Sequence, residues 1–247
     1  MLIERRAYTF RPGTLDAFWK AQMVRGVDPE TRPIMAGLIS YFETASGPSD
    51  QIVHLWRYDS YEDWFSRLFF KNPKSEPYYR VVRPLMLEQE NRFMLPAPVA
   101  GLSPLWSKEQ DWLTGGIAIA DLEIHPGLIV EEETTVLQPG SIPAYWEACT
   151  SYARDTGVET PRQMIGCFYT LVGQQHQVTQ YRWHHDLLER EAIVRAERDS
   201  RSHRNFLEAI NLVTVSRKVT LLRPAPIPRL APLFRHGVQA ASKAGDS

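Results

Sequence analysis

The chain has 247 residues, of which 43% are hydrophobic and 23% charged, and its formal net charge is −1 at pH 7. This composition is that of an ordinary globular protein, and the length suits one large domain or two of about 100 residues each. Without a basic surplus we expect neither nucleic acid nor an anionic membrane as a partner. No apolar run approaches the roughly 18 residues of a membrane span.

The two cysteines, Cys149 and Cys167, are too few for a disulfide framework. The first residues, MLIERRAYTF, carry charge where a secretory signal needs an apolar run. We therefore expect a soluble protein of the reducing cytoplasm. Aromatic residues make up 11% of the chain, and such side chains fill cores but also line apolar ligand cavities.

An internal repeat organises the sequence. LIERRAYTFRPGTLDAFWKA at 2–21 resembles IVEEETTVLQPGSIPAYWEA at 129–148, and Pro12-Gly13 lies 127 positions before Pro139-Gly140. Further matches keep the same order: Gly37 with Gly166, Val53 and Arg57 with Val178 and Arg182, and PAP at 96–98 with PAP at 224–226. We predict four segments: a first copy at 1–98, a partly packed connector at 99–128, a second, diverged copy at 129–226, and a tail at 227–247.

The first copy predicts six elements in order. A strand over 3–10 ends at a Pro-Gly turn signal, and a helix follows with Thr14 as its N-cap. Strands at 38–46 and 51–58 flank the hairpin loop SGPSD. A helix then begins after Asp59 or Ser60, with apolar residues up to Phe69 on one face, a further helix covers about 77–88, and a last strand lies near 90–95.

The order β-α-β-β-α-β is that of a ferredoxin-like unit. The second copy repeats it, with Ser141 as the first N-cap, strands around the turn GQQH, and Asp186 as the cap of a later helix. Helices cover one face of such a sheet, so the bare face needs a partner. We predict an α+β fold in which tandem ferredoxin-like domains pair sheet to sheet into a barrel with the helices outside.

The strand at 51–58 carries the main candidate site. Alternation places His54, Trp56 and Tyr58 on one face and Arg57 on the other. In the same register the second copy puts Tyr181 and Trp183 on the corresponding face. These side chains could line a cavity for a planar ligand, with His54 as acid, base or hydrogen-bond donor. The alternative is ordinary sheet core with a satisfied core histidine.

Arg6 and Tyr8 share a face of the first strand with Glu4. If that strand neighbours 51–58, Arg6 joins His54 as a candidate catalytic residue, and Tyr8 lines the same cavity. The alternative is a surface ion pair. Tyr41 and Tyr169, on the second strand of each copy, add ring surface that serves either a ligand or the core.

Motifs for other chemistry are missing from the sequence. In a strand, the two adjacent histidines of WHHD at 183–186 would point in opposite directions, and we identify no residues that would complete a metal site with them. The chain has no GxSxG, GxxxxGK or GxGxxG. We therefore expect no metal and no cofactor.

Four stretches of the first copy resemble the NIPSNAP family of the dimeric α+β barrel superfamily: ERRAYTFRPG, GLISYFETASGP, VHLWRYDS and ENRFMLPAP. The second copy departs from this pattern, with Glu133 and Thr135 in place of Arg6 and Tyr8. The resemblance implies a ferredoxin-like barrel and a homo-oligomer, but no particular reaction. The superfamily includes cofactor-free monooxygenases and cyclase-like enzymes, which is kinship of fold only.

Two functions follow as hypotheses. The first is binding of a small apolar or aromatic molecule in a barrel cavity, with cofactor-independent oxidation, cyclisation or rearrangement of it. The second is a non-enzymatic NIPSNAP-type module for protein interaction or signalling. The sequence leaves open whether the chain is an enzyme.

Overall fold

The computed structural model describes residues 1–26, 30, 32–68, 76–106, 122–158 and 163–234. The first half contains β1 (Leu2–Phe10), α1 (Leu15–Arg25), η1 (Pro33–Gly37), β2 (Leu38–Ser46), β3 (Gln51–Tyr58), α2 (Tyr61–Leu68), α3 (Glu76–Val82), η3 (Arg83–Leu85), β4 (Met86–Pro96) and η4 (Ala100–Leu102). The second half contains β5 (Ile129–Leu137), α4 (Ile142–Thr156), β6 (Met164–Val172), β7 (Gln177–His184), α5 (Leu187–Asp199), α6 (Arg201–Asn211), β8 (Thr214–Pro224) and η5 (Pro228–Leu230).

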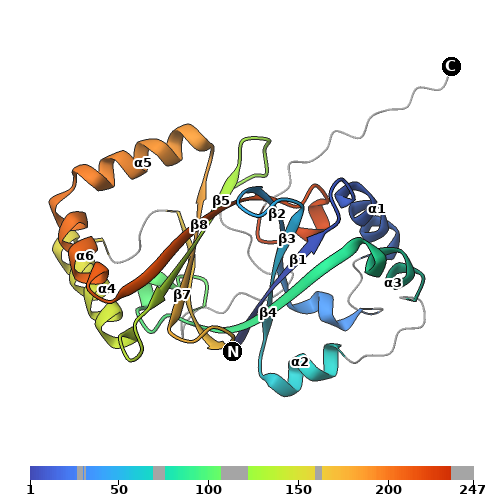
Figure 1. The fold of residues 1–247 in the computed structure, drawn as a ribbon, viewed down its shortest axis with the longest axis horizontal. Coiled ribbons are helices and arrows are strands. Elements are labelled where there is room, and N and C mark those ends of the chain that lie inside the picture. Colours follow the sequence, from blue (N-terminus) through green and yellow to red (C-terminus); the bar gives the residue numbers. More distant parts are fainter. Residues whose placement is uncertain (27–29, 31, 69–75, 107–121, 159–162, 235–247) are drawn as a thin grey trace.

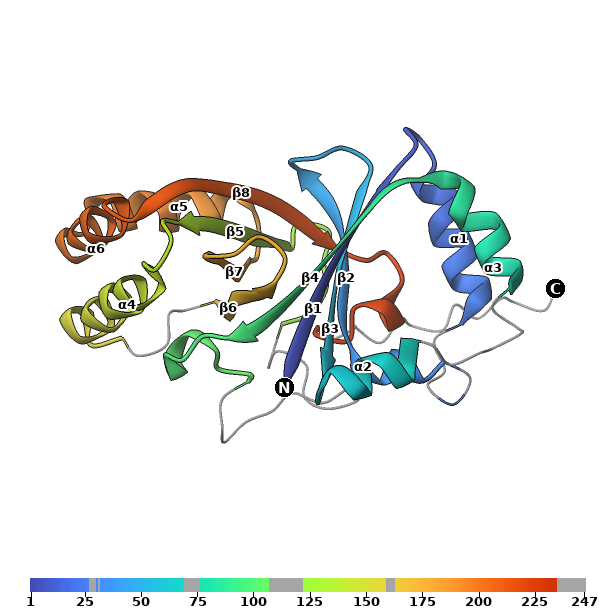
Figure 2. The same cartoon turned by 60° about the horizontal axis from the view of Figure 1, so that its bottom comes forward.

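The strands close into one eight-stranded barrel in the order β1-β3-β2-β8-β5-β7-β6-β4. Each half supplies a four-stranded antiparallel sheet, and the two sheets join at both edges, where β2 pairs with β8 and β4 with β6. The helices of the first half lie on one side of the strands and those of the second half on the other (Figure 1, Figure 2). The predicted α+β barrel is confirmed, and the backbone hydrogen bonds at the two joins leave no open sheet edge.

Strand register decides which side chains face the interior. On β1, Arg5 points into the barrel, where it meets Glu132 of β5. Alternation then sends Glu4, Arg6 and Tyr8 to the outer face, toward α1, α2 and α3. The candidate residues of the first half therefore lie between the sheet and its covering helices, and not in the barrel interior.

The ends of several elements differ from the prediction. The helix expected at 77–88 ends at Val82, and β4 starts at Met86 rather than near 90. Pro84 explains the early end, because proline disfavours helical backbone at the residue before it. Thr14 and Ser141 are the N-cap residues of their helices, as predicted, but neither side chain makes a capping hydrogen bond. Asp186 also caps its helix as predicted, and its carboxylate accepts a hydrogen bond from the Glu189 amide at 2.8 Å.

The repeat carries one correction of register. Glu4 of β1 lies opposite Trp56, and Glu131 of β5 lies opposite Arg182, so Arg182 corresponds to Trp56 and not to Arg57. The matches of Val53 and Arg57 with Val178 and Arg182, and of Gly37 with Gly166, are therefore wrong by one or more residues. A shift of one residue moves every side chain of a strand to the other face.

Parts of the predicted connector and tail lie outside the described residues, namely 107–121 and 235–247, as does Phe69. Within the described connector, the indole of Trp106 is buried against Phe168, at 5.2 Å between ring centroids. None of the helices that the structure describes is both long and apolar enough to cross a membrane.

Candidate functional site

A cavity of about 230 Å³ lies between the outer face of the first sheet and the helical segments that cover it. Its walls combine aromatic rings with guanidinium groups. The aromatic lining is Tyr8, Tyr41, Trp56, Tyr78 and Tyr79, and the basic lining is Arg6, Arg25, Arg32, Arg67 and Arg83. No aspartate or glutamate is among the described residues that line it. We refer to this space as the arginine cavity.

The location corrects the sequence interpretation, which placed the site inside the barrel. Arg6, Tyr8, Tyr41 and Trp56 line the arginine cavity from the sheet side, on the wall that faces the helices. The sequence groups these side chains on one face of the strands, but it could not say whether that face meets the helices or the barrel interior, because charged residues occur on both faces.

Arg6 belongs to a buried network on the sheet. Its Nη2 donates to Glu4 Oε2 at 2.7 Å, and Asn91 Nδ2 donates to Glu4 Oε1 at 2.8 Å. The Tyr58 hydroxyl also donates to Glu4 Oε2, at 3.1 Å. Although burial alone would lower it, the neighbouring Tyr8, Tyr58 and Glu4 raise the pKa of the Arg6 guanidinium. Arg6 is therefore charged, but Glu4 neutralises it within the protein.

His54 lies behind this lining rather than in it. Its Nδ1 accepts a hydrogen bond from Trp56 Nε1 at 2.5 Å, and its ring stacks on Tyr41 with 4.3 Å between centroids. Its Nε2 has no partner among the described residues, and His54 does not line the arginine cavity. Burial, together with the charges of Arg6 and Arg5, holds the pKa of His54 well below its usual value. This imidazole is neutral at pH 7, in a packed position typical of a core histidine.

Arg25 and Arg32 line the cavity without a carboxylate partner among the described residues. Arg25 Nη2 donates to the Tyr79 hydroxyl at 2.8 Å, and the guanidinium lies 4.0 Å from the centroid of Tyr78. Arg32 Nη1 donates to the Gly26 carbonyl at 2.5 Å. Neither arginine has an ion pair with a carboxylate in the described part of the chain.

The two charges are costly to hold together without an anion. Arg32 is only 5% exposed, and burial together with the charge of Arg25 lowers its pKa to about 10. Buried cations are normally paired. A negatively charged group placed between Arg25 and Arg32 would relieve both the desolvation and the repulsion, and neither residue was a candidate in the sequence interpretation.

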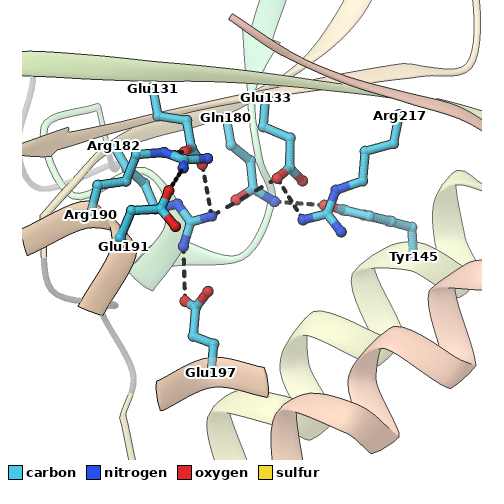
Figure 3. Close-up of polar contacts among 9 residues, drawn as sticks. All are labelled: Glu131, Glu133, Tyr145, Gln180, Arg182, Arg190, Glu191, Glu197 and Arg217. Carbon is cyan, nitrogen blue, oxygen red and sulfur yellow. Dashed lines mark hydrogen bonds and ion pairs between the residues drawn. The ribbon is translucent and has the colours of Figure 1, made fainter. Parts of the chain in front are cut away.

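The second half has a cavity at the corresponding place, of about 90 Å³, with a different chemistry. Glu133 occupies the position of Arg6 there, and Arg217 Nη2 donates to it at 2.6 Å. Arg182, at the position of Trp56, donates to Glu197 at 2.9 Å and to Glu131 at 3.2 Å. Figure 3 shows that each arginine of this cluster points at a carboxylate. The second cavity supplies its own counter-ions.

The other predicted ligand-binding residues lie apart from the arginine cavity. Tyr181 and Trp183 face the barrel interior, where the Tyr181 hydroxyl donates to Glu132 Oε2 at 2.7 Å. Tyr169 is on the outer face of the second half, 6.3 Å from Trp146 between ring centroids. Tyr58 is fully buried beside Glu4 and is not part of the lining. Among the described residues, no three histidine, cysteine or acidic side chains form a group that could hold a metal ion.

Comparison with known proteins separates the two halves. Residues 3–100 match the family model NIPSNAP. An uncharacterized NIPSNAP-like domain protein from Burkholderia xenovorans is 30% identical over 45% of this chain and 92% of its own, with a TM-score of 0.38. A NIPSNAP family protein from Agrobacterium tumefaciens is also 30% identical, over 39% of this chain and 93% of its own, with a TM-score of 0.35.

Over the whole length the likeness is one of fold. An anthrone oxidase-like protein is 12% identical, and the alignment covers 91% of each chain with a TM-score of 0.54. That structure shares the full two-sheet barrel. Among curated proteins, none matches the chain.

Proposed function

The chain belongs to the NIPSNAP family through its first half, and from this premise we propose that the arginine cavity binds a small aromatic molecule that carries an anionic group. The observation that carries the proposal is the pair Arg25 and Arg32, a half-buried and a buried cation without a carboxylate partner among the described residues. The ligand would supply the missing charge.

The aromatic lining supports a planar body for this ligand. Tyr8, Tyr41 and Trp56 present rings from the sheet, and Tyr78 with Tyr79 presents rings from α3. Stacked and edge-on contacts with such rings add to the area that a flat ligand buries. A cavity of about 230 Å³ suits a compound of one or two rings. The anionic end would lie at Arg25 and Arg32, with the ring system between the sheet and the helices.

Cofactor-independent oxidation is the reaction that this arrangement supports. Arginines that stabilise a bound phenolate or enolate lower the pKa of the parent compound, and the resulting anion is electron-rich. A ring CH₂ group conjugated with that anion would lose two hydrogen atoms and gain one oxygen atom from dioxygen, and the second oxygen atom would leave as water. The likeness to the anthrone oxidase-like protein is one of fold alone. It suggests dioxygen as a co-reactant to test.

Titration calorimetry with three matched compounds tests the binding step. 1-Naphthoate is the anion, 1-naphthamide its neutral analogue, and 1-naphthylmethylamine the cation. We expect naphthoate to bind at least about tenfold more tightly than the amide, since a charge-assisted hydrogen bond contributes about 1.5 to 3 kcal/mol. We expect no binding of the amine.

Two variants locate the site. Arg25→Gln should weaken naphthoate binding by about tenfold or more and leave the amide unchanged. Arg217→Gln, the same change in the self-neutralised second cavity, should leave naphthoate binding as in the wild type. Equal affinity for all three compounds would contradict the proposal, and so would loss of binding in Arg217→Gln alone. Failure of every compound to bind would favour the non-enzymatic interaction module.

A further inference from the structure

The interior of the barrel holds a buried ion pair that joins the two halves. Arg5 Nε and Nη2 donate to Glu132 Oε2 and Oε1, each at 2.8 Å. Both side chains are more than nine-tenths buried. β1 and β5 are four places apart in the closed order of eight strands, so the pair spans the barrel between opposite walls.

Arg5 and Glu132 occupy the same position of the repeat. They are 127 residues apart, the spacing that also relates the two Pro-Gly turns. Arg5 lies opposite Leu55 of β3, and Glu132 lies opposite Tyr181 of β7, which is the equivalent rung of each sheet. The joins β2 with β8 and β4 with β6 are equivalent too, so the halves are related by an approximate two-fold axis.

A barrel built from two identical halves would bring this position against its own copy. Two first halves would place one Arg5 against another, and two second halves would place Glu132 against Glu132. Like charges buried at that distance repel each other, and the only other carboxylate that pairs with Arg5 among the described residues is the exposed Glu90, at 4.0 Å. The bidentate pair observed here is available only when a first half meets a second half.

Tyr181 adds a second asymmetry to the same contact. Its hydroxyl donates to Glu132 Oε2 at 2.7 Å, whereas the first half has Leu55 at the equivalent place and offers no donor. The carboxylate therefore receives hydrogen bonds from both halves. The contact residues of each half therefore complement those of the other half and not those of an identical half.

We infer that Arg5, Glu132 and Tyr181 form a specificity determinant that commits each first half to pair with a second half, in the same or another copy of the chain. Self-pairing of like halves is disfavoured by the like charges at this contact. Every barrel then contains one arginine cavity and one self-neutralised cavity. This inference does not depend on the ligand, because none of its three residues lines the arginine cavity.

Charge exchange in the full-length chain tests the inference. Arg5→Glu and Glu132→Arg each create a like-charge contact, and we expect each to lower the melting temperature by roughly 10 °C. The double exchange Arg5→Glu/Glu132→Arg restores opposite charges and should recover most of that loss. A double exchange that melts no higher than the less stable single variant would overturn the inference.

Mixing the two single variants separates pairing specificity from stability. A first half carrying Arg5→Glu complements a second half carrying Glu132→Arg, and the remaining two halves keep the natural pair. Co-expressed chains of different mass should therefore form a dimer with exchanged halves, seen by native mass spectrometry well above the level given by two wild-type chains. Rescue of solubility on co-expression supports the inference even if each variant alone is insoluble, and a mixture without excess heterodimer or rescue overturns it.

Discussion

Replacing Arg32 by glutamine should stabilise the ligand-free protein. Burial and the nearby Arg25 lower the pKa of Arg32 from its ordinary value to about 10, and this difference corresponds to about 3 kcal/mol against the charged form. Below pH 10 the folded protein carries this cost in full, because Arg32 is then charged in both the folded and the unfolded state. Loss of the hydrogen bond to the Gly26 carbonyl offsets about 1 kcal/mol.

The expected net gain is about 2 kcal/mol, which corresponds to a rise in melting temperature of roughly 4 to 8 °C for a chain of this size. Thermal unfolding at pH 7, followed by circular dichroism, measures it. In the same samples naphthoate should raise the melting temperature of the wild type and have little effect on Arg32→Gln.

Arg182→Gln is the matched control, since it removes a buried arginine that has carboxylate partners. Burial alone would lower the pKa of Arg182, but the nearby carboxylates of Glu197, Glu131 and Glu133 raise it. Breaking such a buried ion pair destabilises the folded protein by about 3 kcal/mol. The two variants should therefore shift the melting temperature in opposite directions. A lower melting temperature for Arg32→Gln without ligand would refute the reasoning, because Arg32 would then be stabilised by the protein alone.

Two further predictions concern β3 and the segment η1 that packs against it. His54→Gln should lose less stability on acidification than the wild type. Below pH 6.5 the unfolded wild-type chain takes up a proton at His54 while the buried imidazole of the folded protein stays neutral. This difference removes up to about 1.4 kcal/mol of wild-type stability per pH unit. Urea unfolding at pH 7 and pH 5 measures this, and parallel losses in the two proteins would show that His54 is protonated when folded. Gly37→Ala should cost about 1 to 3 kcal/mol in urea unfolding, since a Cβ there would lie 2.3 Å from the Arg57 carbonyl oxygen. An unchanged urea midpoint would mean that the backbone at Gly37 relaxes freely.

The barrel could be predicted because its signals are local. The strands at 38–46 and 51–58 match β2 and β3, since alternation marks each strand and the polar hairpin loop separates them. The PAP matches also hold: Met94 pairs with Ile3 and Leu222 with Val130, each two residues before its PAP.

The candidate site could be predicted only from its sheet side. Alternation correctly grouped Arg6 and Tyr8 with Trp56, but it could not say which face the helices cover. Arg25 comes from the end of α1 and Arg32 from the entry to η1, so no spacing in the sequence links them. Their proximity arises from tertiary packing. In the sequence alone, each resembles an ordinary surface arginine.

The homo-oligomer and the cytoplasmic location stay predictions.

A crystal structure of the protein with 1-naphthoate tests the central claim most directly. We predict the carboxylate within hydrogen-bond distance of both Arg25 and Arg32, and the ring system against Tyr41 and Trp56. Naphthoate bound in the second cavity or inside the barrel, with Arg25 and Arg32 unoccupied, would contradict the claim.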